Sequence, residues 1–207
     1  ELQELRATFE SGDFNIGSGN VTDLPDFQLD VVDAILENSG KPSRPVRIAI
    51  DCGNAVPGPL AVELMKRSGV DLVPIHCSWD NAFPNHPPDP TRVENMADLA
   101  RAVTENGCEF GIGMDGDGDR IGVVDELGNF IHPDRLMTLF AKDILSGRES
   151  LSEEERTVFF DVKCSLALEE SILEYGGVPV MVRTGHSFMK RELDRNPSSP
   201  LAGEMSG

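Results

Sequence analysis

Short apolar runs alternate with amphipathic segments along most of this 207-residue chain, and this alternation constrains the fold more than any other feature. The predicted strands cover residues 46–50, 70–75, 110–114, 121–124, 158–160 and 178–182. The predicted helices between and after them cover residues 57–67, 92–105, 133–144, 166–175 and 187–193. Strands that alternate with helices in this way predict βαβ units and a largely parallel sheet.

The alternation occurs twice, once in each half of the chain. In both halves a strand ends in an aspartate just before a helix, at Asp51 and at Asp161. We therefore predict an α/β fold with two similar three-layer α/β domains and mixed, largely parallel sheets. Residues 26–128 form the first of these domains and residues 129–207 the second. Residues 1–25 are predicted to be the remnant of a preceding domain and a linker, since residues 11–23 are rich in Gly, Ser and Asn.

One predicted helix in the second half also shows which of its sides should be buried. Pro133 is well placed to start a helix. Four apolar residues are expected to line the buried side of this helix: Leu136, Leu139, Phe140 and Ile144.

Charge and cysteine content exclude several classes of partner. The 36 acidic and 18 basic residues give a net charge of −18, which repels nucleic acid and anionic membrane surfaces. No apolar run approaches the roughly 20 residues of a membrane-spanning helix. The four cysteines are widely spaced and form no C-x-x-C pair, so we expect reduced thiols and a cytoplasmic protein.

The segment with the clearest chemistry places Asp115, Asp117 and Asp119 at alternate positions, separated by glycines and followed by Arg120. Like charges ~4 Å apart repel by roughly 4 kcal/mol at an effective dielectric constant near 20, so three such carboxylates require a cation. Hard oxygen ligands favour Mg²⁺ or Ca²⁺. The arginine suggests that a second anion, such as phosphate, is bound beside the metal.

Other interpretations of this aspartate loop (residues 115–120) remain to be weighed. An EF-hand would have Glu126 at position 12, but it requires glycine where Arg120 stands, and its flanks should be helical. A solvated acidic turn, or a non-catalytic divalent-cation-binding acidic module, is an open alternative. A metal-dependent phosphatase would need Asp51 or Asp161 as its nucleophile, and neither begins the expected D-x-D-x-T pattern.

Further candidate residues follow predicted strands, where ligands gather in parallel α/β sheets. Lys163 and His186 each leave a strand end and could reach one anionic ligand, although a surface lysine and a helix-cap histidine are the simpler interpretation. Glu204 and Ser206 could bind the vicinal hydroxyls of a sugar, or they could form a plain turn. The remaining histidines have no partner at ligand spacing, and a structural role is expected for each: His76, His86 and His132.

Together these segments resemble the α-phosphohexomutase family, in particular its bacterial phosphomannomutase/phosphoglucomutase branch. The resemblance rests on four motifs in order: Asp115-Gly116-Asp117-Gly118-Asp119-Arg120, Asp161-Val162-Lys163-Cys164, Thr184-Gly185-His186-Ser187 and Gly203-Glu204-Met205-Ser206-Gly207. It runs nearly end to end. The Glu204-Met205-Ser206 form is similar to the hexose branch of the family.

The resemblance implies a role for each candidate residue. Members of this family have four domains around a central cleft, so the chain would hold the end of the first, the whole second and most of the third, truncated at its C-terminus. The resemblance assigns Asp115, Asp117 and Asp119 to Mg²⁺. Arg120, Lys163 and His186 would be catalytic residues. Those expected to bind substrate are Lys163, His186, Glu204 and Ser206.

The resemblance also implies an activity. Phosphate would move reversibly between the 1- and 6-hydroxyls of mannose or glucose phosphates through an enzyme phosphoserine and a hexose 1,6-bisphosphate. The serine of the first domain and the phosphate-binding loop of the fourth are absent from these 207 residues. We therefore expect the chain to be inactive alone, to bind Mg²⁺ weakly, and to act together with domains one and four.

Overall fold

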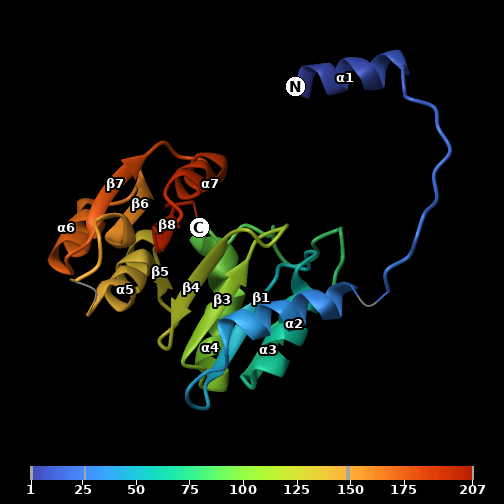
Figure 1. The fold of residues 1–207 in the computed structure, drawn as a ribbon. Helices are drawn as coiled ribbons and strands as arrows, with labels where there is room; N and C mark the ends of the chain where they lie inside the picture. Colours follow the sequence, from blue (N-terminus) through green and yellow to red (C-terminus); the bar gives the residue numbers. More distant parts are fainter. Residues whose placement is uncertain (1, 26, 148–149, 207) are drawn as a thin grey trace.

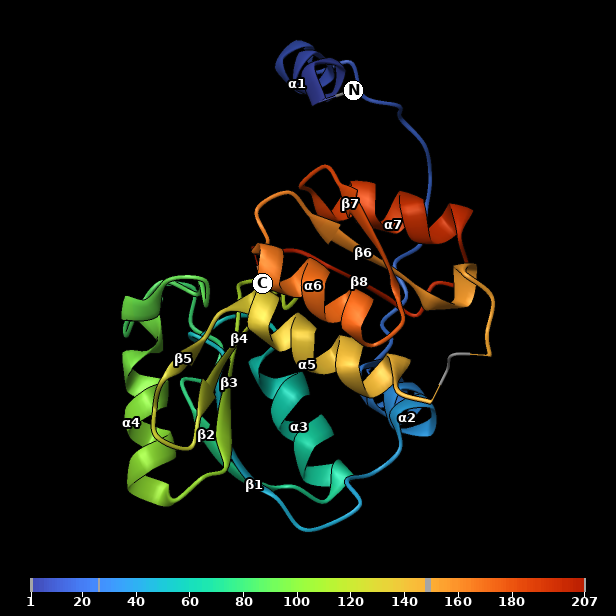
Figure 2. The same cartoon turned by 90° about the vertical axis from the view of Figure 1, so that its left-hand side faces the viewer.

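The computed structural model describes residues 2–25, 27–147 and 150–206, so the predicted boundaries at Glu1, Asp26 and Gly207 lie outside the described residues. Two sheets, each with helices on both faces, form two adjoining units (Figures 1 and 2). We call the unit that follows the N-terminal segment the first domain and the unit that begins with α5 (Pro133–Leu145) the second domain.

The first domain contains a mixed sheet of five strands in the order β2-β1-β3-β4-β5. These strands are β1 (Arg47–Asp51), β2 (Asp71–Ile75), β3 (Phe110–Met114), β4 (Ile121–Asp125) and β5 (Phe130–Ile131). Strand β1 pairs in parallel with β2 and β3, whereas β3–β4 and β4–β5 are antiparallel. The carboxyl ends of β1, β2 and β3 therefore meet at one edge of the sheet.

Helices cover both faces of this sheet. Helices α2 (Phe27–Ser39) and α3 (Gly58–Ser68) lie on one side, and α4 (Ala97–Asn106), entered through a 3₁₀ turn at Val93–Met96, lies on the other (Figure 2). Successive side chains of β1 explain both contacts, because they alternate between faces. Ala49 packs in a buried cluster with Leu99 of α4, and Ile50 packs with Ala61 of α3.

Two glycines of β3 allow α4 to lie close to the sheet. A Cβ atom on Gly111 would lie 2.7 Å from Val103 and 2.8 Å from Leu99, and one on Gly113 would lie 2.8 Å from the sulfur of Met96. Strands normally avoid glycine, so these positions mark a close approach of helix and strand.

The second domain contains a parallel sheet in the order β7-β6-β8. Its strands are β6 (Thr157–Asp161), β7 (Val178–Val182) and β8 (Leu201–Gly203), and its helices are α5, α6 (Leu166–Glu174) and α7 (His186–Arg195). Helices α5 and α6 lie on one face and α7 on the other (Figure 2). All five residues of β6 are buried, as expected for a central strand. Both domains confirm the predicted α/β fold class.

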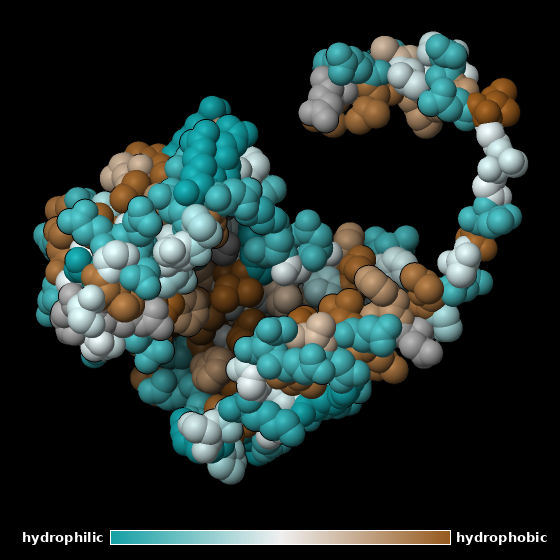
Figure 3. All heavy atoms as spheres, in the orientation of Figure 1, coloured by the Kyte–Doolittle hydropathy of each residue, from teal (hydrophilic) through white to brown (hydrophobic). Residues whose placement is uncertain are grey.

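The buried side of α5 differs from the prediction. Met137, Ala141 and Leu145 are buried, whereas Leu139 is 59% and Phe140 41% exposed. Both apolar rows are spaced by whole helical turns, so the sequence alone could not decide between them. Leu136 and Ile144, the other two residues predicted to be buried, are partly buried. Leu136, Leu139 and Phe140 border a groove on the first domain's sheet, with Phe110, Ile121 and Val123. Figure 3 shows hydrophobic side chains in the hollow between the domains.

The N-terminal segment stands apart from both domains. Helix α1 (Leu2–Ser11) buries none of its residues and is joined to α2 by an extended stretch at residues 12–25 (Figure 1). The link between the domains is much shorter, since His132 alone separates β5 from α5. Within the described part of the chain, no helix combines the length and apolar character that crossing a bilayer demands.

Candidate functional site

The aspartate loop connects β3 to β4 at the carboxyl edge of the first sheet. Asp115 is buried, whereas Asp117 and Asp119 are exposed, and one carboxylate oxygen from each lies within 4.8 Å of those from the other two. Gly118 has a φ of +78°, which an L-residue adopts only with strain, and this turn brings the alternate aspartates together. Three converging carboxylates fit a hard divalent cation such as Mg²⁺ or Ca²⁺.

Arg120 binds the buried aspartate of this loop. Its backbone N–H donates to Asp115 Oδ1 at 3.0 Å, and its Nε and Nη2 atoms lie 2.8 and 2.7 Å from Oδ2. Burial alone would raise the pKa of Asp115, but the hydrogen bonds and charge of Arg120, with a contribution from Asp117, lower it. Asp115 is therefore ionised at neutral pH. Arg120 also lies 3.6 Å from Asp89 and 3.7 Å from Asp119.

In the second domain a buried carboxylate connects the loops that follow the three strands. Asp161, the last residue of β6, has no exposed surface. Its Oδ2 accepts a hydrogen bond from Thr184 Oγ1 at 2.7 Å, and its Oδ1 accepts one from Met205 N at 3.0 Å and one from Cys164 Sγ at 3.1 Å. Burial opposes ionisation, yet these donors lower the pKa of Asp161. The Asp161 carboxylate thus connects all three loops.

Glu204 forms a second connection between two of these loops. Its Oε1 accepts a hydrogen bond from Gly185 N at 2.7 Å, and its Oε2 accepts one from Ser206 Oγ at 2.7 Å. Gly185 precedes His186, the first residue of α7, and has a φ of +131° that favours glycine. Because a carboxylate oxygen accepts more than one hydrogen bond, Glu204 can still bind a hydroxyl of a ligand.

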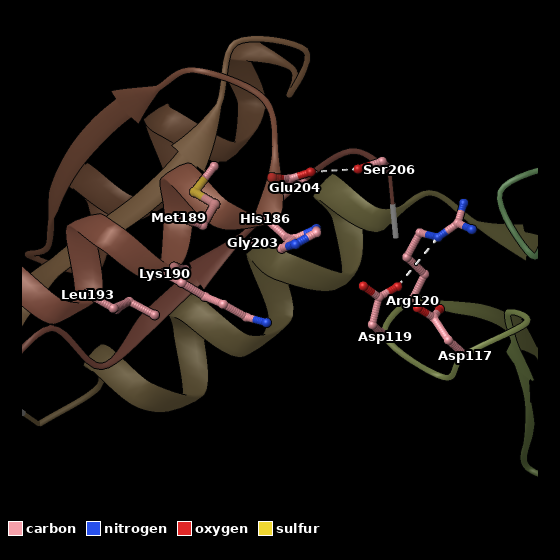
Figure 4. A pocket seen from close by; sticks show the side chains of 11 residues that line it. Asp117, Asp119, Arg120, His186, Met189, Lys190, Leu193, Gly203, Glu204 and Ser206 are labelled. Atoms are coloured by element: carbon pink, nitrogen blue, oxygen red, sulfur yellow. Dashed lines mark hydrogen bonds and ion pairs between the residues drawn. The ribbon is translucent and has the colours of Figure 1, made fainter. Parts of the chain in front are cut away.

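The two domains face each other across a cleft of about 490 Å³. The residues that line it come from the aspartate loop, α7 and β8 with its following loop: Asp117, Asp119, Arg120, His186, Met189, Lys190, Leu193, Ala202, Gly203, Glu204 and Ser206 (Figure 4). The lining places Arg120 and Lys190 on opposite walls of the cleft. In a chain with a net charge of −18, these cations form the local basic environment that an anionic ligand needs.

Most predicted site residues meet in this cleft. Asp115 lies buried behind Asp117 and Asp119, bound to Arg120. Lys163 is exposed just after β6 and is not among the residues that line the cleft.

Sequence analysis missed Lys190, which lines the cleft on the same helix as His186. The spacing of His186 and Lys190 could have indicated it, because residues four apart lie on one face of a helix.

The burial of Asp51 and Asp161 argues against the phosphatase alternative. Asp51 is 2% exposed; its Oδ1 accepts a hydrogen bond from Gly53 N at 2.8 Å and its Oδ2 lies 3.0 Å from His86 Nε2. Both oxygens of Asp161 are hydrogen-bonded as well. A nucleophile must reach its substrate, and these carboxylates face only protein groups.

Comparisons with known proteins agree with this arrangement. The family model described as "Phosphoglucomutase/phosphomannomutase, alpha/beta/alpha domain II" matches residues 29–128, and the model for alpha/beta/alpha domain III matches residues 132–207. The chain is 40% identical over 210 residues to a phosphomannomutase/phosphoglucomutase of Pseudomonas aeruginosa, with all of this chain and 43% of that protein covered.

Two further relatives support the same assignment. A phosphoglucomutase of Neisseria gonorrhoeae is 41% identical over 208 residues, covering all of this chain and 44% of that protein. The crystal structure of a phosphoglucomutase/phosphomannomutase family protein from Burkholderia thailandensis superposes with a TM-score of 0.86 at 38% identity, covering 99% of this chain and 43% of that one. The chain spans less than half of these relatives, and it belongs to the phosphoglucomutase/phosphomannomutase family, of which it holds domains II and III.

Proposed function

We propose that this chain is the central part of a phosphohexomutase that moves phosphate reversibly between the 1- and 6-hydroxyls of mannose and glucose phosphates. The observation that carries the proposal is the cleft, where the aspartate loop faces His186, Lys190, Glu204 and Ser206. Carboxylates for a metal, cations for phosphate and hydrogen-bonding groups for hydroxyls are the parts that phosphoryl transfer to a sugar requires.

Asp115, Asp117 and Asp119 would hold Mg²⁺, which when bound neutralises charge on the transferred phosphate. Arg120 orients Asp115 through its Nε and Nη2 atoms. Its Nη1 atom lies 3.6 Å from Asp89 and would be the atom that binds a phosphate oxygen. Across the cleft, Lys190 and His186 would bind the phosphate that is not being transferred. Glu204 and Ser206 would bind the sugar hydroxyls.

The hydrogen bonds of Asp161 and Glu204 keep these groups in place before substrate arrives. Fixed charges and donors need not reorganise during the reaction, and this is the main source of catalysis in phosphoryl transfer. Lys163 would act on this site through its charge: against the burial of Asp161, the hydrogen bonds from Thr184, Met205 and Cys164 lower the pKa of Asp161 most, and the charge of Lys163 lowers it further.

The phosphorylated serine and the fourth-domain phosphate loop would lie in parts of the protein outside these 207 residues. We therefore propose that the full-length protein cycles through a phosphoserine and a hexose 1,6-bisphosphate, whereas the chain alone does not turn over. Cytoplasmic localisation remains a prediction.

The test is a coupled assay of glucose 6-phosphate formation from glucose 1-phosphate, with the corresponding mannose assay beside it. The full-length protein should be active with Mg²⁺, and Asp117→Ala should reduce kcat at least about 100-fold, since it removes a ligand from the reacting centre. Asp143→Ala, an exposed aspartate on α5, is the matched control. Tight Ca²⁺ binding with no mutase activity in the full-length protein would instead establish a non-catalytic cation-binding module.

A further inference from the structure

A second group of metal-ligating side chains lies in the first domain, away from the cleft-lining residues. Asp51 ends β1, His76 follows β2, and His86 lies in the proline-rich segment before α4; one ligand atom from each lies within 4.8 Å of the other two. Asp98 of α4 adds a carboxylate, 3.0 Å from His76 Nε2. We call these four residues the histidine cluster. Sequence analysis gave both histidines only a structural role.

The hydrogen bonds of His86 define which ring nitrogen can bind a metal. Its Nδ1 lies 2.9 Å from the carbonyl oxygen of Pro87, which can only accept, so Nδ1 carries a hydrogen. In the neutral ring, Nε2 then turns its lone pair toward Asp51 Oδ2 at 3.0 Å. Two lone pairs at this distance require a cation between them, either a proton or a metal ion. Metal-binding histidines typically donate their other N–H to a carbonyl or carboxylate.

His76 has a matching arrangement on the other side of the cluster. Its Nε2 is held by Asp98, which leaves Nδ1 for a ligand. Its φ is +48°, and its carbonyl oxygen accepts a hydrogen bond from Asn54 N at 2.7 Å. Asn54, His76 and Phe83 are the non-glycine residues with positive φ in the described parts of the chain; His76 belongs to the cluster, and Asn54 and Phe83 each lie three residues along the chain from a member, Asp51 and His86. Strained backbone of this kind concentrates at functional sites.

Burial and charge favour a cation here. The side chains of Asp51, His86 and His76 are 2%, 16% and 19% exposed. With His86 neutral, the buried Asp51 carries a negative charge that no cationic side chain in the described parts of the chain pairs with, whereas the more exposed Asp98 is paired with Arg101 at 2.5 Å. His76 also lines a surface pocket with Asn54, Cys77 and Ser78, so one member of the cluster borders solvent.

We infer that the histidine cluster is a second metal site, which binds a divalent d-block ion such as Zn²⁺ through Asp51, His76 and His86. Imidazole with carboxylate suits Zn²⁺, Co²⁺ or Ni²⁺, whereas the all-oxygen aspartate loop suits Mg²⁺. Asp98 and the Pro87 carbonyl orient the two rings. Ligand atoms at ~2.1 Å from zinc lie ~3.4 Å from one another, so binding would move His86 Nε2 and Asp51 Oδ2 apart from their present 3.0 Å and hold the His76 ligand atom, now within 4.8 Å of both, at the same spacing.

The test is a Co²⁺ titration of the 207-residue chain, followed by visible absorption, with Zn²⁺ as competitor. It is run in an Asp117→Asn background, which weakens the aspartate loop as a competing site, and with excess Mg²⁺ present to occupy what remains of it. One ion should bind per chain, and His76→Phe should weaken binding at least tenfold. His132→Gln, a change of a histidine outside the cluster, should leave it unchanged. Equal affinity in the His76→Phe and His132→Gln proteins would overturn the inference.

A second measurement does not depend on variants that fold. In ¹⁵N histidine spectra of the unmodified chain, one equivalent of Zn²⁺ should shift the ring nitrogens of His76 and His86 and leave those of His132 and His186 in place. Shifts confined to His132 or His186 contradict the proposed ligands. A sulfur-to-cobalt charge-transfer band contradicts them too, because it would identify Cys77 or Cys52 as the ligand.

Discussion

The hydroxyl of Thr184 donates a hydrogen bond to the carboxylate of Asp161 at 2.7 Å, from the loop after β7 to the end of β6. Asp161 has no exposed surface, so the bond cannot be replaced by water without local opening. It therefore fixes the loop that begins the helix carrying His186 and Lys190.

Thr184→Val tests the energy of this contact. The change keeps the shape of the side chain but removes the donor, and we expect the free energy of unfolding of the second domain to fall by roughly 1–3 kcal/mol, because the acceptor is a buried ion. Urea unfolding followed by circular dichroism measures it. Thr184→Ser, which keeps the hydroxyl, should lose less. Trp79, the single tryptophan, lies in the first domain. The urea midpoint of unfolding followed by Trp79 fluorescence should therefore not change.

Acid should destabilise the second domain through Asp161 and Asp134. Burial alone would raise both pKa values; hydrogen bonds, to Asp161 from Thr184 and Met205 N and to Asp134 from Ser165 N, lower both. A lowered folded-state pKa gives stability that is present above the unfolded pKa, about 3.9, and is lost as the pH falls through the folded value.

The urea midpoint of the second domain should therefore decrease as the pH is lowered from 6 to 3. The Asp161→Asn protein should be less stable at pH 6 and should show a shallower pH dependence. Parallel curves for the two proteins would mean that Asp161 does not titrate during unfolding in this range.

Gly58→Ala tests the packing at the start of α3. A Cβ atom there would lie 2.2 Å from the backbone carbonyl oxygen of Cys77, which cannot rotate away. We expect a loss of about 3 kcal/mol in the stability of the first domain, seen as a lower urea midpoint of Trp79 fluorescence. Gly17→Ala is the matched control, since nothing lies within 4 Å of its new Cβ atom.

Asp117→Asn should weaken divalent-cation binding at the aspartate loop at least about tenfold, because it removes one of three ligand charges. Free Mn²⁺ in the presence of the chain, measured by electron paramagnetic resonance with Mg²⁺ as competitor, gives the affinity. Asp117 is exposed, so the urea midpoint should stay unchanged. Asp143→Asn, which changes an exposed aspartate on α5, should bind Mn²⁺ like the unmodified chain.

Lys190→Gln should raise the KM of the full-length enzyme for glucose 1-phosphate by roughly tenfold, with a smaller effect on kcat, if this lysine binds the phosphate that is not transferred. Lys66→Gln, an exposed change on α3, serves as the control. An unchanged KM in the Lys190→Gln protein would remove Lys190 from the proposed binding site.

The longer strands and helices could be predicted because their apolar period is visible in a few residues. Strands β5 and β8 were not predicted, because they are two and three residues long and are too short to show an alternation of apolar and polar residues. The choice between the two apolar rows of α5 depends on where the sheets lie, which no local pattern specifies. Long-range pairing also brings His76 and His86 together, since their spacing along the chain gives no sign of contact.

The aspartate loop and the motifs after β6 and β7 could be found from the sequence, because each follows a predicted strand end. The motif at residues 203–207 was found through its two glycines and the family resemblance, since β8 itself was not predicted. The hydrogen bonds that connect them could not. Asp161 and Met205 lie 44 residues apart along the chain, and their contact depends on β8 pairing with β6 in parallel.

His132 is the whole connection between β5 and α5, and α5 also packs against β4. A one-residue linker can act as a hinge, because a small rotation at the linker produces a larger displacement at residues far from it. The separation of Arg120 and Lys190 therefore depends on the backbone torsions of His132 together with the packing of α5 against β4. A substitution at position 132 can therefore widen or narrow the cleft while leaving each domain folded.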